Sequence, residues 1–298
     1  MQEDFTFLGL YDPVSTCLHL VAALGFLIAG YFLVSKALGS KMRVSSVILY
    51  TISLIFLFSM SGTFHLLPYH SSSRDVLQVL DHAAIWILIA GTFTPIHTLM
   101  FRGVKRWGVL LLVWSITIPS VIFTTVFFST MPEWLSLIFY LGLGWIGLLT
   151  GYFVVRQYGF KEAKYLVLGG LAYTFGAVLE FLRWPVLIEG IVEAHDFFHV
   201  FVIFGAGLHW YFIYQHAHWP VYKRQIFLVK HDYKRSYYKA KTKSDTIEVH
   251  ATSLEELKEK IHEAITLKYD RKFPIEQVTL QFIEEEDIYY KVPIIKNS

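Results

Sequence analysis

The sequence predicts an all-α membrane protein, a seven-transmembrane-helix bundle followed by a small C-terminal soluble α+β domain. The first observation is composition. Of 298 residues, 54% are hydrophobic and only 17% are charged, and the mean hydropathy of +0.46 is too apolar for an ordinary soluble domain. The second is that apolar runs of membrane-spanning length recur. The third is a change near Tyr222, after which 15 of the 26 Lys and Arg and 13 of the 24 Asp and Glu occur.

Each apolar run reaches the roughly 20 residues that a helix needs to cross about 30 Å of hydrocarbon. No run shows the ten-residue dyad alternation of a transmembrane β-strand, so helices are expected. The seven runs lie at 17–38, 45–67, 80–101, 107–128, 134–155, 164–187 and 196–217. We therefore expect residues 1–16 to form an N-terminal segment, residues 17–221 to form the bundle and residues 222–298 to form the appended domain.

The charges between the runs predict how the bundle is oriented. The segments after the first, third and fifth runs are basic, with Lys36, Lys41 and Arg43, then Arg102, Lys105 and Arg106, then Arg156, Lys161 and Lys164. The other connections carry few basic residues. Because Lys and Arg are retained on the cytoplasmic side, we expect an extracytoplasmic N-terminus and a cytoplasmic C-terminus in a plasma or inner membrane. The N-terminus also lacks the basic region of a signal peptide.

Residues 222–298 read as a small α+β domain. A strand-like run ends near residue 251, and an amphipathic helix follows, opened by the capping box Ser253-x-x-Glu256. Two further β-rich runs come after the helix. The charges of this region are mixed in sign, which favours a solvated surface over a nucleic-acid-binding patch. We expect this domain to interact with a cytoplasmic protein partner.

Polar residues at three helix ends form a candidate metal site. One cysteine, Cys17, supplies no thiolate cluster, so the ligands must come from His, Asp or Glu. Ser61 and His65 share a face near the end of the second run, and Asp81 begins the third. His195 and His199 share a face at the start of the seventh. All three ends lie on the same side of the membrane. The alternative is a packed, hydrogen-bonded polar core.

These residues resemble a known family. The elements are Ser61-x-x-x-His65, then Asp81 within "LDHAAIWILIAGTFTP", then His195-x-x-x-His199 leading into "HVFVIFGAGLH". In this order they are similar to the progestin and adipoQ receptor family, and especially to its bacterial haemolysin III branch. The resemblance covers residues 14 to about 217 and leaves out the C-terminal domain.

The resemblance implies a seven-helix bundle that holds one zinc ion within the membrane. By position, His65, His195 and His199 correspond to its three imidazole ligands. Asp81 corresponds to a group beside the metal that holds its water, and Ser61 to a polar companion of that aspartate. Three ligands and a water are typical of a catalytic zinc site. The adiponectin receptors of the family have a cytoplasmic N-terminus, so the orientation expected here is inverted relative to theirs.

Three functions follow as hypotheses. The first is a zinc-dependent intramembrane hydrolase of a ceramide-like lipid amide or ester, with a role in membrane-lipid homeostasis and with Asp81 and Ser61 in its catalytic site. The second is a non-enzymatic membrane sensor or receptor with a structural zinc, in which the C-terminal domain signals to its partner. The third is a cytolysin. It is the weakest of the three, because no ring of charges lines a path through the helices.

Overall fold

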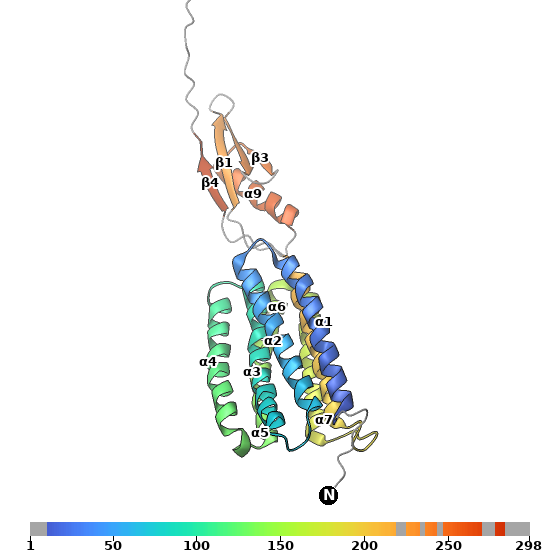
Figure 1. The fold of residues 1–298 in the computed structure, drawn as a ribbon. Helices are drawn as coiled ribbons and strands as arrows, with labels where there is room; N and C mark the ends of the chain where they lie inside the picture. The colour runs from blue at the N-terminus through green and yellow to red at the C-terminus, as the bar shows by residue number, and fades with distance from the viewer. Residues whose placement is uncertain (1–10, 219–224, 233–235, 243–246, 270–277, 284–298) are drawn as a thin grey trace, which may run out of the picture. The chain divides into compact units, whose positions relative to one another are not determined.

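The computed structural model describes residues 11–218, 225–232, 236–242, 247–269 and 278–283. The chain divides into two compact units, Met1–Trp219 and Pro220–Ser298. Within the first unit, helices run alongside one another (Figure 1), and seven spans are long and apolar enough to cross a membrane. The seven-helix prediction is therefore confirmed.

The spans follow one another with short connections. Their helices are α1 (Pro13–Ala37), α2 (Lys41–Leu66), α3 (Ser72–Met100), α4 (Gly103–Phe127) with the 3-10 turn η1 (Phe128–Thr130), α5 (Glu133–Trp145) with α6 (Gly147–Tyr158), α7 (Phe160–Leu182) and α8 (Ala194–His216). Helices α5 and α6 together make the fifth span, with Ile146 between them. Helix α1 packs against α2 and α8, and α3 packs against α2, α4 and α5.

Several helices begin about one turn before the predicted residue, and two helix ends that differ further have local causes. Helix α3 begins at Ser72, about two turns before the expected 80, because the hydroxyl of Ser71 accepts a hydrogen bond from the backbone N–H of Arg74 and caps it. Helix α7 ends at Leu182, not 187. Arg183 adopts a left-handed conformation, φ 51° and ψ 39°, and Pro185 follows, which is a common way for a helix to stop.

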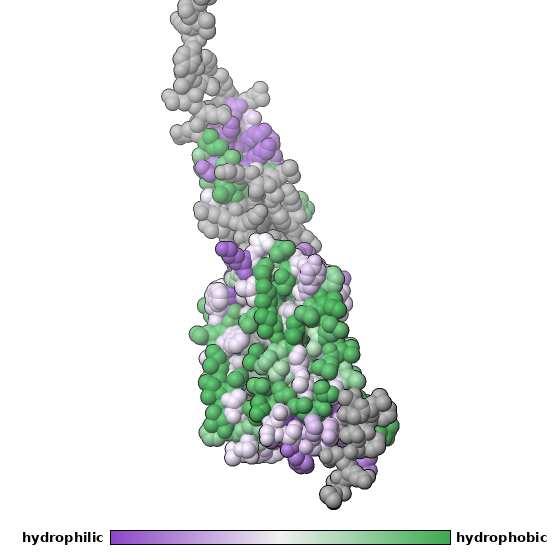
Figure 2. Space-filling model, in the orientation of Figure 1, coloured by the Kyte–Doolittle hydropathy of each residue, from purple (hydrophilic) through white to green (hydrophobic). Residues whose placement is uncertain are grey.

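The outer surface of the bundle is hydrophobic, as lipid requires. Large apolar side chains cover the face seen in Figure 2. On α1, for example, Tyr31 is 71% exposed and Ile28 is 55% exposed. The interior also holds large side chains, of which Tyr50, Leu54 and Phe58 on α2 are fully buried. Both sides of the helices are therefore apolar, as expected of membrane-spanning segments.

The C-terminal unit contains a mixed sheet of order β3-β2-β1-β4. Its elements are β1 (Gln225–Asp232), β2 (Tyr237–Thr242), β3 (Glu248–Ala251), α9 (Leu254–Tyr269) and β4 (Val278–Phe282). Strand β1 pairs antiparallel with β2 and parallel with β4, so the chain returns to the sheet through α9. Phe227 and Val229 of β1 form a core with Leu257 and Ile261 of α9.

The helix and strands β3 and β4 match the prediction for this unit, whereas β1 and β2 were missed. The backbone N–H of Glu256 donates to the hydroxyl of Ser253, as the capping box requires. The Glu256 carboxylate, however, accepts from Thr252. The expected β-rich run near the C-terminus lies outside the described residues.

Close packing of α2 against α3 predicts the effect of a single methyl group. A Cβ atom at Gly91 would lie 2.4 Å from Ser53 Oγ and 2.9 Å from Ser53 Cβ, whereas one at Gly170 meets nothing within 4 Å. We expect Gly91→Ala to lower the free energy of unfolding by about 1–3 kcal/mol through overpacking. The control Gly170→Ala should leave the free energy of unfolding unchanged or raise it slightly. Thermal unfolding in detergent tests this, and equal stability of the two variants would contradict it.

Candidate metal centre

Three histidines from two helices meet at one end of the bundle. His65 lies in the last turn of α2, and His195 and His199 lie in the first turns of α8. Each offers one ring nitrogen to a group in which these atoms all lie within 4.8 Å of one another. The ring centroids are 4.2 to 5.3 Å apart. His65 and His199 are buried, and His195 is partly exposed. An ion bound between them would have three imidazole ligands.

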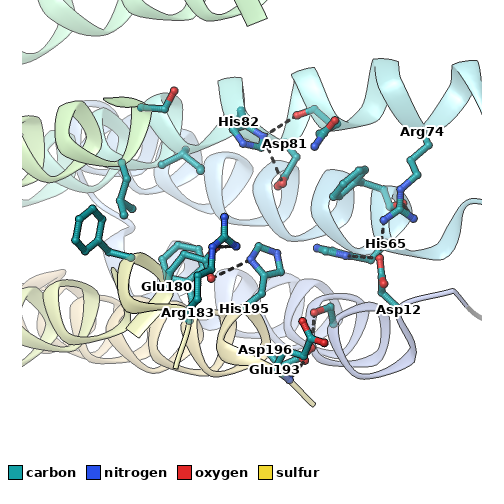
Figure 3. Close-up of a pocket in the computed structure, with 18 of the residues that line it drawn as sticks. Asp12, His65, Arg74, Asp81, His82, Glu180, Arg183, Glu193, His195 and Asp196 are labelled. Carbon is teal, nitrogen blue, oxygen red and sulfur yellow. Dashed lines mark hydrogen bonds and ion pairs between the residues drawn. The ribbon is translucent and has the colours of Figure 1, made fainter. Parts of the chain in front are cut away.

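The Nδ1 atom of each histidine faces an oxygen atom. His65 Nδ1 is 3.0 Å from the Asp12 carboxylate, and His199 Nδ1 is 3.0 Å from the Ser15 hydroxyl. His195 Nδ1 is 3.4 Å from the Glu180 carboxylate. Figure 3 shows the rings of His65 and His195 next to each other, with their carboxylate partners on the outer sides.

Oxygen partners at Nδ1 favour the tautomer in which Nδ1 carries the proton and Nε2 offers its lone pair. Metal-binding histidines use this arrangement, because the outer hydrogen bond orients the ring and raises its basicity. His65 Nε2 is buried and has no hydrogen-bond partner among the described residues. The donor set of three imidazoles with a buried, unpaired Nε2 therefore fits a metal ion.

Asp12 joins three segments at the N-terminus of α1. Its carboxylate accepts hydrogen bonds from His65, from the Tyr69 hydroxyl and, at 2.6 Å, from Arg74. Burial alone would raise the pKa of Asp12, but these hydrogen bonds outweigh burial and hold the pKa well below its usual range. Asp12 is therefore an anion over the whole physiological pH range, and a constant acceptor for the His65 N–H.

Arg74 also fixes the end of the helix that carries His65. Its guanidinium group donates to the carbonyl oxygens of Phe64 and Leu67, at 3.3 and 2.6 Å. These carbonyls belong to the C-terminal turn of α2, where backbone acceptors have no partner within the helix. One arginine on α3 thus orients both Asp12 and the turn that presents His65.

A second junction fixes the start of α8. The Ser15 hydroxyl donates to Asp196 Oδ1 at 2.6 Å and lies beside His199. Asp196 also accepts from the backbone N–H of Glu193, which completes a capping box at this helix end. Helix α1 therefore contacts two of the three histidines through Asp12 and Ser15, one turn apart.

Asp81 lies at the same end of the bundle as the histidine group. It is 9% exposed on α3 and lines the same cavity as His65 and His195. Its carboxylate lies 4.0 Å from His82 Nδ1. The hydroxyl of Ser61 is buried and has no hydrogen-bond partner among the described residues. Asp81 lines the cavity, whereas Ser61 is not among its lining residues.

The cavity in front of the histidines has a volume of about 740 Å³. Helix α5 contributes apolar and aromatic walls through Trp134, Leu137 and Tyr140. Among the described residues, five with carboxylates and two arginines line the cavity: Asp12, Asp81, Glu180, Glu193 and Asp196, with Arg74 and Arg183. Negative charge is in excess, which favours a cation at this place.

The polar residues named from the sequence all lie at this end of the bundle, but their outer partners were missed. Asp12, Ser15 and Glu180 each hold a histidine, and nothing in their local sequence indicates that role. Glu180 also forms an ion pair of 2.8 Å with Arg183. The Ser15–His19 spacing, four residues on α1, is the one available signal for a polar face on that helix.

Comparison with known proteins identifies relatives of the helical bundle. A family model described as haemolysin-III related matches residues 10–210. The chain is similar to a Bacillus subtilis protein named hemolysin-3 homolog, 29% identical over 57% of this chain and 76% of the relative. It is also similar to hemolysin-3 of Bacillus cereus, 30% identical over 57% and 74%. Human monocyte to macrophage differentiation factor is 25% identical over 57% and 69%.

The Asp12–His65 contact predicts an effect on metal binding. In Asp12→Asn the amide keeps nearly the same volume but no longer supplies a charged acceptor to His65. We expect zinc affinity to fall by about 10–100-fold, the usual effect of losing an outer partner. Competition with a chelator measures it. Glu189→Gln, in an exposed loop at the same end, is the control, and equal affinity of both variants would contradict the role of Asp12.

Proposed function

Because the chain belongs to the haemolysin III-related family, we propose that it is a zinc-dependent intramembrane hydrolase of a ceramide-like lipid amide or ester. Its role would lie in membrane-lipid homeostasis. One observation carries the proposal: all three histidines have an oxygen partner at Nδ1, and they offer ligand atoms within 4.8 Å of one another. Outer hydrogen bonds of this kind fix the tautomer and the orientation of histidines that bind a metal.

The choice of zinc rests on the donors. Imidazole without thiolate suits zinc, although copper, iron and nickel also accept it. A bound zinc ion would polarise a carbonyl group and lower the pKa of a water molecule to about 7. Three protein ligands leave a position open for that chemistry, whereas a structural zinc site is normally closed by four.

The protein side chains would bind and orient the reactants. Asp81 lines the cavity next to His65 and His195, where its carboxylate can accept a proton from the attacking water and return it to the leaving amine or alcohol. Ser61, with a hydroxyl that lacks a partner in the described structure, would hydrogen-bond to Asp81 or to the substrate. Asp12, Ser15 and Glu180 hold the imidazoles.

The cavity supports a lipid as the substrate. It combines the apolar wall of α5 with the polar histidine end, which suits a molecule with a polar carbonyl group and hydrocarbon chains. The segment after α7 is also apolar and exposed, with Trp184 at 65% and Leu187 at 65%. With the N-terminus outside, as the loop charges predict, this end would face the outer leaflet.

A non-enzymatic sensor with a structural zinc is the second candidate. The observation in its favour is the separate C-terminal unit with its own hydrophobic core, which a lipid hydrolase does not need for its chemistry. In that case the zinc would join α2 to α8, and the C-terminal unit would signal to a cytoplasmic partner. A cytolytic activity is suggested only by the names of the bacterial relatives.

Replacement of Asp81 separates hydrolysis from metal binding. We expect Asp81→Asn, reconstituted in liposomes that contain ceramides and acyl esters, to keep its zinc and to hydrolyse about 10²–10⁴-fold more slowly, because it loses a general base. Mass spectrometry of the lipids and metal analysis of the same sample measure both quantities. The control is Asp75→Asn, an exposed acid on α3.

Hydrolysis by Asp81→Asn at the wild-type rate would show that the mechanism is wrong. A wild-type protein that holds zinc but hydrolyses none of these lipids would favour the sensor.

A further inference from the structure

A groove on the side of the bundle forms a second cavity. Its volume is about 580 Å³, and residues of α2, α3 and α4 line it. Helix α3 packs against both α2 and α4, and α4 lies at the edge of the bundle in Figure 1. The walls of the groove include Met42 and Leu49 of α2 and Trp107 and Trp114 of α4. Threonines of α3 complete the lining.

The groove lies at the opposite end of α2 from the metal centre. Helix α2 begins at Lys41, one residue before the groove, and His65 is in its last turn. Leu49 is the α2 residue of the groove nearest to His65 in the sequence. At 1.5 Å per residue, these two residues are about 24 Å apart along the helix axis. The groove is therefore separate from the histidine group and from its cavity.

The polar side chains that line the groove bond to other groups of the bundle. The Thr98 hydroxyl donates to the Ser46 hydroxyl at 2.9 Å, and Trp114 Nε1 donates to the Thr94 hydroxyl at 3.1 Å. Ser46 and Thr94 in turn donate to backbone carbonyl oxygens of their own helices. With these donors used internally, the groove suits a hydrocarbon chain better than a polar solute.

Basic residues gather where the groove reaches the end of the bundle. Lys41 is the first residue of α2, and Arg102, Lys105 and Arg106 lie at the cap and in the first turn of α4. The sequence has no Asp or Glu between residues 13 and 74 or between residues 82 and 132, so neither helix carries an acid. Both helices also begin here, and the positive ends of their dipoles add to the attraction for an anion.

Arg106 connects this charged end to the apolar walls. Its Nε atom donates to the backbone oxygen of Phe101 at 2.6 Å, and its Nη1 atom lies 3.6 Å from the Sδ atom of Met42. Met42 itself lines the groove. The guanidinium group therefore lies beside the groove, and its planar array of donors matches the geometry of a phosphate.

We propose that the groove between α2 and α4 binds an acyl chain of one anionic phospholipid, with Arg106 and Lys41 binding its phosphate group. The volume of the groove lies within the roughly 300–1,000 Å³ of small-molecule sites. Basic pockets between transmembrane helices bind anionic headgroups on the cytoplasmic side, to which the loop charges assign this end. The inference goes beyond the proposed hydrolysis and does not depend on the metal ion.

Selectivity for charge distinguishes such a site from ordinary contact with the bilayer. The whole outer surface of the bundle is apolar and would contact acyl chains of any lipid. A site with basic residues at its end should instead prefer an anionic headgroup, by about fivefold in affinity for each basic residue that takes part.

Native mass spectrometry counts the lipids bound to the full-length protein and measures their affinity. The protein is mixed in detergent with phosphatidylglycerol or with phosphatidylcholine of the same acyl chains. We expect the wild type to bind one phosphatidylglycerol about 5–25-fold more tightly than phosphatidylcholine. The preference should disappear in Lys41→Gln/Arg106→Gln. Lys164→Gln, which removes an exposed basic residue near the start of α7, is the control and should keep it.

A second pair of variants tests the groove without changing its charge. Ser45 is exposed on the α2 wall, and the indole of Ser45→Trp would fill the space of the acyl chain. We expect this variant to lose the bound phosphatidylglycerol although the basic residues remain. Ser115→Trp places the same side chain on an exposed position of α4 that does not line the groove, and should keep the lipid.

Equal affinity of the wild type for the two lipids would overturn the inference, and this comparison needs no variant that must fold. Tight binding of phosphatidylglycerol by folded Ser45→Trp would also contradict it, because the lipid would then bind elsewhere. A wild-type dimer that is lost in Ser45→Trp would show that a second copy of the chain, not a lipid, occupies the groove. None of these outcomes involves zinc, so they leave the proposed function untouched.

Discussion

The site depends on the Asp12 carboxylate, where donors from α2, the following loop and α3 meet. Its bonds to His65 and Arg74 place the start of α1 against the end of α2. Without that anion, the His65 N–H would lose its acceptor and the buried arginine charge would keep only backbone carbonyl oxygens as acceptors, and removing one partner of a buried ion pair is strongly destabilising. The two histidines of α8 then reach the same place because Ser15, one turn further along α1, binds Asp196 and His199.

This arrangement places charged side chains near the hydrocarbon region of the membrane. Ionisable groups near the hydrocarbon region are expensive unless they pair or coordinate a cation. Arg74 pairs with Asp12 and Arg183 with Glu180, but the cavity still has more carboxylates than guanidinium groups. A divalent ion between the imidazoles would reduce this excess, so metal binding and the stability of this end of the bundle should be linked.

The sequence was sufficient to predict those features of the fold that repeat along the chain or have a local period. Apolar runs predicted the seven spans, and the four-residue spacing of His195 and His199 placed both on one face of α8. Helix ends depended on local geometry, such as the Ser71 cap and the left-handed Arg183. Strands β1 and β2 were missed, and β2 alternates lysine with small or aromatic residues, without the apolar run of a typical buried strand.

Long-range pairs could not be predicted in the same way. Asp12 meets residues 53 and 62 positions away, and Ser15 meets residues more than 180 positions away. Such contacts depend on how α1 packs against α2 and α8, which no local pattern specifies.

The central claim is that the histidine group holds one metal ion, and elemental analysis of the purified protein tests it most directly. The account predicts about one zinc per chain in the wild type and none in a folded His195→Ala/His199→Ala double variant. An absence of metal from the folded wild type, purified without chelators and supplied with zinc, would contradict the account and reduce the group to a packed polar core.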